Sequence, residues 1–294
     1  MIKRQKNLEQ KCIEAFNPPF SINRPVRSTS PLIFASPHSG HIYPKALLAM
    51  SRLDLSALRR NEDSYIHELF SSVTALGVPF IWANFPRCFV DVNRAATEIP
   101  TRLGVKDTTP TPRSRIGLGV VPEIIAEKMP IYDRDLSRND VLARVNALHI
   151  PYHNALKDML VATQAEHGRA ILIDCHSMPG FSPIGSRRPD IILGDRNGQS
   201  CRPHTLEQVE EAFKVRGYNV ERNYPYAGGY VTEHYADPDN GVETLQIEIN
   251  RELYMNSLTR AKNAGYEKLE ANVMDIARDI IRGIDQSDQL IAAQ

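Results

Sequence analysis

Short runs of β-branched and aromatic residues alternate along the chain with longer segments whose apolar residues recur at helical spacing. The short runs end abruptly in polar clusters, which is typical of strands buried on both faces. These strands are expected at residues 31–36, 78–84, 88–92, 170–174, 190–193 and 244–249. The longer segments predict helices at 53–76, 138–166, 205–215 and 257–284. Strands that alternate with helices predict an α/β sheet covered on both faces.

The segment 97–135 departs from this alternation. It carries several prolines, three glycines and a basic cluster formed by Arg113 and Arg115. Loops of such length in a compact domain are usually binding segments or lids. We expect a long ordered loop here, and a short strand or helix hidden inside it is an open alternative.

The chain has 294 residues, enough to bury a large core without disulfide or metal staples. It shows no repeat, low-complexity linker or charge block that would separate two independent domains. The expected organisation is an N-terminal arm at 1–30 followed by one domain at 31–294.

Charge and hydropathy narrow the classes of function. The 35 Lys and Arg residues balance the 35 Asp and Glu residues, so the excess positive charge that drives nucleic-acid binding is absent. No stretch approaches the roughly 20 apolar residues that a membrane span needs. The first thirty residues lack the apolar run of a secretory signal, which predicts a cytoplasmic protein. The balanced charge and the lack of a long apolar stretch predict that it binds neither nucleic acid nor membrane. A homodimer is compatible with the sequence, which leaves the oligomeric state open.

The four cysteines are far apart and form no CxxC pair. Neither a disulfide framework nor a cysteine zinc site is therefore indicated. We expect four reduced thiols that pack in the interior.

Polar residues gather directly after the expected strands. In open α/β sheets ligands bind beyond the carboxyl ends of the strands, so these residues are the first candidates for chemistry. They occur in four blocks: Pro37-His38-Ser39-Gly40, Asp91-Val92-Asn93-Arg94, Asp174-Cys175-His176-Ser177 and Gln246-Ile247-Glu248-Ile249-Asn250-Arg251.

His38 and His176 follow separate strands, and a carboxylate from Glu62 or Asp63 would complete a site with two histidines and one acid. A catalytic zinc needs such a set, with one position left for water. Asp174 precedes His176 by two residues and is a candidate to orient its imidazole. The alternative is that both histidines are ordinary turn residues bonded to backbone carbonyls.

Glu248 lies within an apolar strand with isoleucine on either side. An unpaired buried carboxylate is costly unless a cation compensates it, so Glu248 is a candidate general base. The alternative is a strand face that reaches solvent, with Gln246, Glu248 and Asn250 alternating outward.

Arg94 can bind a substrate carboxylate with its planar guanidinium, and a structural ion pair with Asp91 is the other role, compatible with the first. The segment from Tyr224 to Tyr230 combines two glycines with three tyrosine hydroxyls and, on composition alone, is a turn. The sequence contains no Gly-rich phosphate loop, GxSxG elbow or HExxH helix. The remaining histidines show no mutual spacing, and most are expected at the surface or on helix faces: His41, His67, His149, His153, His167, His204 and His234.

Taken together, these blocks resemble the N-formylglutamate amidohydrolase family in order and spacing. The resemblance also includes Leu193-Gly194-Asp195 and Asn223-Tyr224-Pro225-Tyr226-Ala227-Gly228-Gly229-Tyr230, and it covers roughly residues 31 to 260. Its most specific blocks are Asp174-Cys175-His176-Ser177-Met178 and Gln246-Ile247-Glu248-Ile249-Asn250-Arg251. The family is related to the zinc carboxypeptidases and aspartoacylase. The resemblance therefore implies their phosphorylase/hydrolase-like fold, a mixed, mostly parallel sheet flanked by helices, with 31–294 as one catalytic domain.

The resemblance also implies residue roles. It places the metal ligands at His38, His176 and an acid, for which Asp63 is preferred and Glu62 is the alternative. Glu248 becomes the general base, and Arg94 acts in both catalysis and substrate binding. The substrate-binding set implied is Asn93, Arg94, Arg87, Tyr226 and Arg251. The second cation that a dicarboxylate needs is left open among Arg87, Arg113, Arg115, Arg187, Arg188 and Arg251.

The function implied is metal-dependent hydrolysis of N-formyl-L-glutamate to formate and L-glutamate, with Zn²⁺, Co²⁺ or Mn²⁺ as the metal. The first alternative is a zinc deacylase of another N-acyl amino acid or a carboxypeptidase-like peptide hydrolase. A metal-free protein that binds a small dicarboxylate is the alternative from another class. The partner expected is a small N-acyl amino acid.

Overall fold

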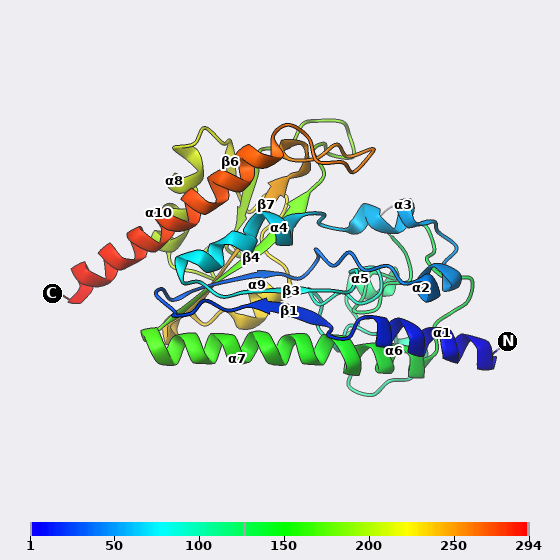
Figure 1. Ribbon diagram of the computed structural model, residues 1–294. Coiled ribbons are helices and arrows are strands. Elements are labelled where there is room, and N and C mark those ends of the chain that lie inside the picture. The colour runs from blue at the N-terminus through cyan, green and yellow to red at the C-terminus, as the bar shows by residue number, and fades with distance from the viewer. Residues whose placement is uncertain (1, 126–127, 293–294) are drawn as a thin grey trace. The chain divides into compact units, whose positions relative to one another are not determined.

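A computed structural model describes residues 2–125 and 128–292 of the chain, so residues 126–127 of the predicted loop and both chain ends lie outside the described residues. Within the described part, seven strands form one sheet in the order β1-β3-β2-β4-β7-β5-β6 (Figure 1). The strands are β1 (Phe20–Asn23), β2 (Leu32–Ser36), β3 (Phe80–Ala83), β4 (Ala170–Met178), β5 (Ile191–Gly194), β6 (Val220–Arg222) and β7 (Val242–Asn250).

The centre of the sheet is parallel and one neighbour is reversed. β4 pairs in parallel with β2 and with β7, whereas β5 runs antiparallel to β7 and parallel to β6. Every residue of β2, β4 and β5 is buried, which is typical of strands covered on both faces. The predicted mixed, mostly parallel α/β sheet is confirmed.

One predicted strand is wrong and two strands were not predicted. Residues 88–92 form turns, because the amides of Phe89 and Val90 donate to the carbonyl of Pro86. The apolar side chains of this run are buried, but its backbone does not pair as a strand. The two strands that the pattern missed are β1 and β6, which are short and carry few apolar residues.

The α-helices are α1 (Ile2–Ala15), α2 (Lys45–Met50), α3 (Leu55–Leu58), α4 (Ile66–Ser71), α5 (Pro112–Arg115), α6 (Arg138–Arg144), α7 (Ile150–His167), α8 (Pro203–Lys214), α9 (Tyr230–Tyr235) and α10 (Tyr266–Ala292). Short 3-10 turns lie at Arg59–Asn61, Ser72–Leu76, Thr101–Leu103, Pro238–Asn240 and Arg251–Leu253, and a π-helical stretch at Val145–His149 joins α6 to α7. The helices predicted at 138–166 and 205–215 are therefore confirmed. The segment 53–76 is broken into several short helices, and the last predicted helix begins at Tyr266 rather than at 257.

Contacts divide the chain into two compact units. Unit 1 comprises the described residues of Met1–Ser21, Pro37–Ser64 and Trp82–Lys157. Unit 2 comprises those of Ile22–Ser36, Tyr65–Ile81 and Asp158–Gln294. The organisation expected from the sequence, an arm at 1–30 and one domain at 31–294, stays a prediction.

Unit 2 contains the centre of the sheet and its helical cover. On one face α10 packs against α4 and α8, and the other face is covered by α9 and the later half of α7 (Figure 1). β2, β4 and β7 supply the core of this unit, and the polar residues at their carboxyl ends are buried as well.

Unit 1 is held together by a buried ion pair. Arg144 of α6 is fully buried and donates from Nη2 to Glu9 Oε2 of α1 at 2.9 Å. Its Nη1 donates to the hydroxyl of Tyr132 and to the carbonyl of Phe89. A buried charge is costly unless it is fully paired, and α1 supplies the carboxylate that pairs with Arg144. The helix α1 is therefore an integral part of unit 1.

The four cysteines all lie in the described part of the chain, where they are buried and free, as predicted. Burial raises the pKa of the Cys88 thiol to about 12, which keeps it protonated and unreactive at neutral pH. No helix of the described chain has the length and apolar content that crossing a membrane requires.

Candidate metal centre and active site

His38 follows the end of β2 by two residues. β2 lies beside β4 with Ala35 opposite Asp174, so the segment that carries His38 leaves the sheet at the edge where β4 also ends. Gly40 allows the turn after His38, because a side chain at this position would lie 2.0 Å from the carbonyl oxygen of Phe85. The glycine of the His-Ser-Gly block is thus required by close backbone packing.

Two carboxylates lie beside the His38 ring. Nε2 lies 2.7 Å from Asp91 Oδ1, and Nδ1 lies 3.7 Å from Asp63 Oδ2. Burial alone would raise the pKa of Asp91, but the charge of Arg87 and the hydrogen bond with His38 outweigh it and hold the pKa of Asp91 well below its usual range. An ionised Asp91 only accepts hydrogen bonds, so His38 donates from Nε2 and directs the lone pair of Nδ1 toward Asp63.

Asp63 is held beside His38 by the backbone. Its amide donates to the carbonyl of His38 at 3.0 Å. Two residues later Tyr65 adopts a φ of 68°, a left-handed conformation uncommon for a tyrosine, and α4 begins directly afterwards. This turn breaks the helix that was predicted across 53–76 and leaves Asp63 in the loop between two helices.

Glu62, the alternative ligand, has other partners. It is buried and forms a two-contact pair with Arg59, at 2.9 Å from both Nε and Nη2. The hydroxyl of Ser64 also donates to it, at 2.6 Å. Asp63, not Glu62, is therefore the carboxylate beside the histidine.

His176 lies within β4 and is accompanied by Asp174, two residues earlier on the same face of the strand. His176 Nε2 lies 3.0 Å from Asp174 Oδ2, and both side chains are buried. Neither oxygen of Asp174 has a hydrogen-bond partner among the described residues, so the contact with His176 is one of distance only. A carboxylate beside one nitrogen of a histidine leaves the other nitrogen for a metal. Each candidate histidine thus has its own carboxylate, Asp91 for His38 and Asp174 for His176.

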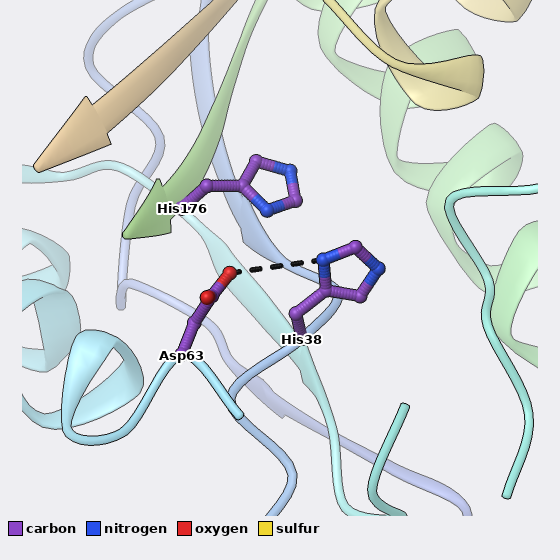
Figure 2. A group of neighbouring side chains, drawn as sticks. All are labelled: His38, Asp63 and His176. Atoms are coloured by element: carbon purple, nitrogen blue, oxygen red, sulfur yellow. Dashed lines mark ion pairs between the residues drawn. The ribbon is translucent and has the colours of Figure 1, made fainter. Parts of the chain in front are cut away.

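His38, Asp63 and His176 form a group that can hold a metal ion. All three are buried, and one ligand atom from each lies within 4.8 Å of the others. Figure 2 shows the three side chains turned toward one another. Two imidazole nitrogens and one carboxylate oxygen make a donor set that suits a first-row divalent metal such as zinc. The residues therefore fit the metal that the resemblance implied.

Glu248 lies beside His176 in the sheet. The two residues are partners in the parallel pairing of β4 with β7, so their side chains point to the same face from strands about 4.8 Å apart. Gln246, Glu248 and Asn250 are 4%, 8% and 0% exposed. The alternative interpretation, a strand face that reaches solvent, is therefore wrong.

Asn93 and Arg94 follow the turns at 88–92 in unit 1. Arg94 Nη1 donates to the carbonyl of Asn93, and Asp91 pairs with Arg87 at 2.8 Å. The salt bridge of Asp91 is thus formed with Arg87, and the charge of Arg94 adds to the lowering of the pKa of Asp91. Among the described residues Arg94 Nε is buried without a hydrogen-bond partner.

Two histidines hold the backbone of this segment. His149 Nε2 lies 2.8 Å from the carbonyl of Arg94, and His153 Nε2 lies 2.8 Å from the carbonyl of Val92. The two rings lie against each other in a tilted arrangement, with centroids 4.3 Å apart. His149 is only 3% exposed, so of the two expected positions it has the one on a helix face and not the one at the surface. The overlooked signal was the four-residue spacing, which places both rings on one face of a helix.

The other predicted substrate-binding residues have structural contacts of their own. Arg251 is buried and donates from Nε to the hydroxyl of Ser177 at 3.0 Å. The guanidinium of Arg188 lies 5.6 Å from the centre of the Tyr226 ring. Arg187 pairs with Asp190.

Known proteins share both the sequence pattern and the fold. A family model described as N-formylglutamate amidohydrolase matches residues 30–255. The chain belongs to this family. It is 28% identical over 235 residues to the N-formylglutamate deformylase of Pseudomonas aeruginosa, an alignment that covers 78% of this chain and 84% of that protein. It is 27% identical over 230 residues to the N-formylglutamate deformylase of Pseudomonas putida, covering 76% and 82%. The crystal structure of N-formylglutamate amidohydrolase from Ralstonia eutropha JMP134 matches with a TM-score of 0.85 and 31% sequence identity, covering 92% of this chain and 99% of that chain.

The long loop of this N-formylglutamate amidohydrolase family member brings a further arginine toward Arg94. Arg113 lies on the short helix α5, whose first residue is capped by Thr111. Buried Glu98 accepts from the amide of Ala95 at 3.1 Å and from the hydroxyl of Thr111 at 2.8 Å, which joins the Arg94 segment to α5. Partial burial of its guanidinium, together with the positive charges of Arg94 and Arg87, lowers the pKa of Arg113.

The metal group predicts a role for Asp174. Removing the carboxylate partner of a metal-binding histidine typically weakens metal affinity by about 10- to 100-fold. Asp174→Asn is therefore expected to weaken metal binding by about that factor, measured by competition against a chelator of known affinity. Asp239→Asn changes an exposed aspartate and is the control. Equal metal affinity in the Asp174 variant and the wild type would contradict the assignment.

Proposed function

We propose that this protein is a metal-dependent amidohydrolase that converts N-formyl-L-glutamate and water into formate and L-glutamate. The observation that carries the proposal is the buried group of His38, Asp63 and His176 in a chain of the N-formylglutamate amidohydrolase family. Both curated relatives named above are N-formylglutamate deformylases, which supports the choice of substrate. We further propose that the protein works in the cytoplasm.

The metal is proposed to be zinc, bound through Nδ1 of His38, a carboxylate oxygen of Asp63 and a ring nitrogen of His176. Zinc in such a site lowers the pKa of water to about 7 and polarises carbonyl groups. The donor set also suits Co²⁺ or Mn²⁺, and metal analysis of the purified protein distinguishes these.

Glu248 is proposed as the general base. It accepts a proton from the water that attacks the formyl carbon, and it returns that proton to the nitrogen of the leaving glutamate as the amide C–N bond breaks. Its place beside His176 in the sheet supports this role.

Arg94 and Arg113 are proposed to bind the two carboxylates of the substrate, with Asn93 beside Arg94. A guanidinium binds a carboxylate through two parallel hydrogen bonds, which gives both affinity and orientation. Arg187 and Arg251 have the contacts described above, whereas Arg113 is joined to the Arg94 segment through Glu98. These contacts support Arg113 as the proposed second cation.

Glu248→Gln tests the base assignment. The amide keeps the size of the side chain but cannot accept a proton, so turnover of N-formylglutamate is expected to fall by about 10²- to 10⁴-fold while bound metal stays at the wild-type level. Glu243→Gln is the matched control, because Glu243 is a buried carboxylate on the same strand that accepts from Thr205 and from the amide of Arg202. Near-full activity of Glu248→Gln would make the assignment wrong.

Arg113→Gln tests the substrate-binding assignment. The loss of one charge-assisted carboxylate contact, about 1.5–3 kcal/mol, is expected to raise KM for N-formylglutamate by at least about tenfold. In the same variant, KM for an N-formyl amino acid with an apolar side chain should rise much less, because that substrate lacks the second carboxylate. Arg115→Gln on the same helix is the control. Equal KM for N-formylglutamate in both variants would show that the second carboxylate binds elsewhere.

A further inference from the structure

The loop formed by Tyr224–Tyr230, which we call the tyrosine loop, is fixed to the end of β5. Gly194 ends that strand, and a side chain there would lie 2.7 Å from the carbonyl carbon of Ala227. Asn223 Nδ2 donates to Asp195 Oδ1 at 2.6 Å, and the amide of Arg196 donates to the carbonyl of Ala227 at 2.7 Å. The Leu-Gly-Asp block thus anchors the tyrosine loop, for which the proposed function gives no role.

The tyrosine loop is connected to Glu248 through one side chain. The amide of Gly229 donates to Gln246 Oε1 at 2.9 Å, and Gln246 Nε2 donates to Glu248 Oε1 at 3.1 Å. A backbone N–H can only donate, so it settles the orientation of the Gln246 amide and turns the NH₂ group toward the carboxylate. Gln246 is 4% exposed, so water competes little for these contacts.

We infer that Gln246 is a positioning residue that holds the carboxylate of Glu248 in the orientation required for proton transfer, with the tyrosine loop as its support. This inference rests on the proposed function, because it takes Glu248 to be the base. In this account the tyrosine loop contributes to catalysis through the backbone amide of Gly229, which holds Gln246. This contribution does not depend on the tyrosine side chains.

The chemistry of the hydrogen bond explains why glutamine suits this position. A carboxylate can rotate about its last torsion, and a donor on one oxygen restricts that rotation. A base must lie within hydrogen-bond reach of the proton that it accepts, and a displacement of about 1 Å can lower the rate by about 10²-fold. Gln246 donates to Glu248 while its oxygen is held by Gly229, so both ends of the amide are used.

Two substitutions separate the contacts of Gln246. Gln246→Glu keeps an oxygen for the amide of Gly229 but replaces the donor to Glu248 with a like charge. Gln246→Met keeps the length and removes both contacts. Both variants are expected to lower kcat on N-formylglutamate by about tenfold to a hundredfold, with KM within about twofold of the wild type and metal content unchanged.

Thr244→Val is the matched control. Thr244 is buried on the same face of β7, and its hydroxyl donates to the carbonyl of Thr232 at 2.6 Å, so the variant loses one buried hydrogen bond next to the Gln246 position. Its kcat should remain at the wild-type level. A fall in kcat for Thr244→Val equal to that for Gln246→Met would overturn the inference, because it would show a general effect of packing.

The double variant tests whether Gln246 acts through Glu248. In a Glu248→Gln background, Gln246→Met is expected to cause no further loss of kcat, since there is no base left to orient. The same tenfold or greater loss in that background would overturn the inference, and so would wild-type kcat in both single variants. A wild type that turns over no N-formylglutamate would instead contradict the proposed function itself.

Discussion

The register of β4 is the constraint on which the candidate site depends. β4 pairs in parallel with β2 on one side and with β7 on the other, so Ala35 lies opposite Asp174 and His176 lies opposite Glu248. A shift of one residue would turn His176 to the other face of the sheet and separate it from Glu248. In β7 the buried residues Ile247 and Ile249 alternate with Gln246, Glu248 and Asn250, so a shift of one residue would turn these polar side chains to the opposite face.

The polar residues of the site are buried, and most of them lie against a second polar group. Asp91 holds His38, Asp174 lies beside His176, and Gln246 donates to Glu248. Without partners such groups would be costly to bury, by about 1–3 kcal/mol each and more when charged. The same partners fix tautomers and rotamers, so the arrangement that makes burial tolerable also orients the groups for metal binding and proton transfer.

The central strands and the residues that follow them could be predicted from the sequence, because buried parallel strands are continuous apolar runs with polar ends. The run at 88–92 is apolar too, but short apolar runs do not distinguish strands from buried turns. Before α10, the side chain of Asn256 accepts from the amides of Leu258 and Thr259, which competes with a helix. The resemblance already favoured Asp63 over Glu62, whereas the role of Gln246 depends on the amide of Gly229. That hydrogen bond is a tertiary contact that no local pattern records.

The most direct measurement is the metal content of the wild type and of His176→Ala, with release of glutamate from N-formylglutamate assayed on the same samples. The account predicts about one metal ion per wild-type chain together with turnover, and the loss of both in the variant. A well-folded wild type that takes up no metal after zinc is added, and that still releases glutamate at the same rate as His176→Ala, would contradict it.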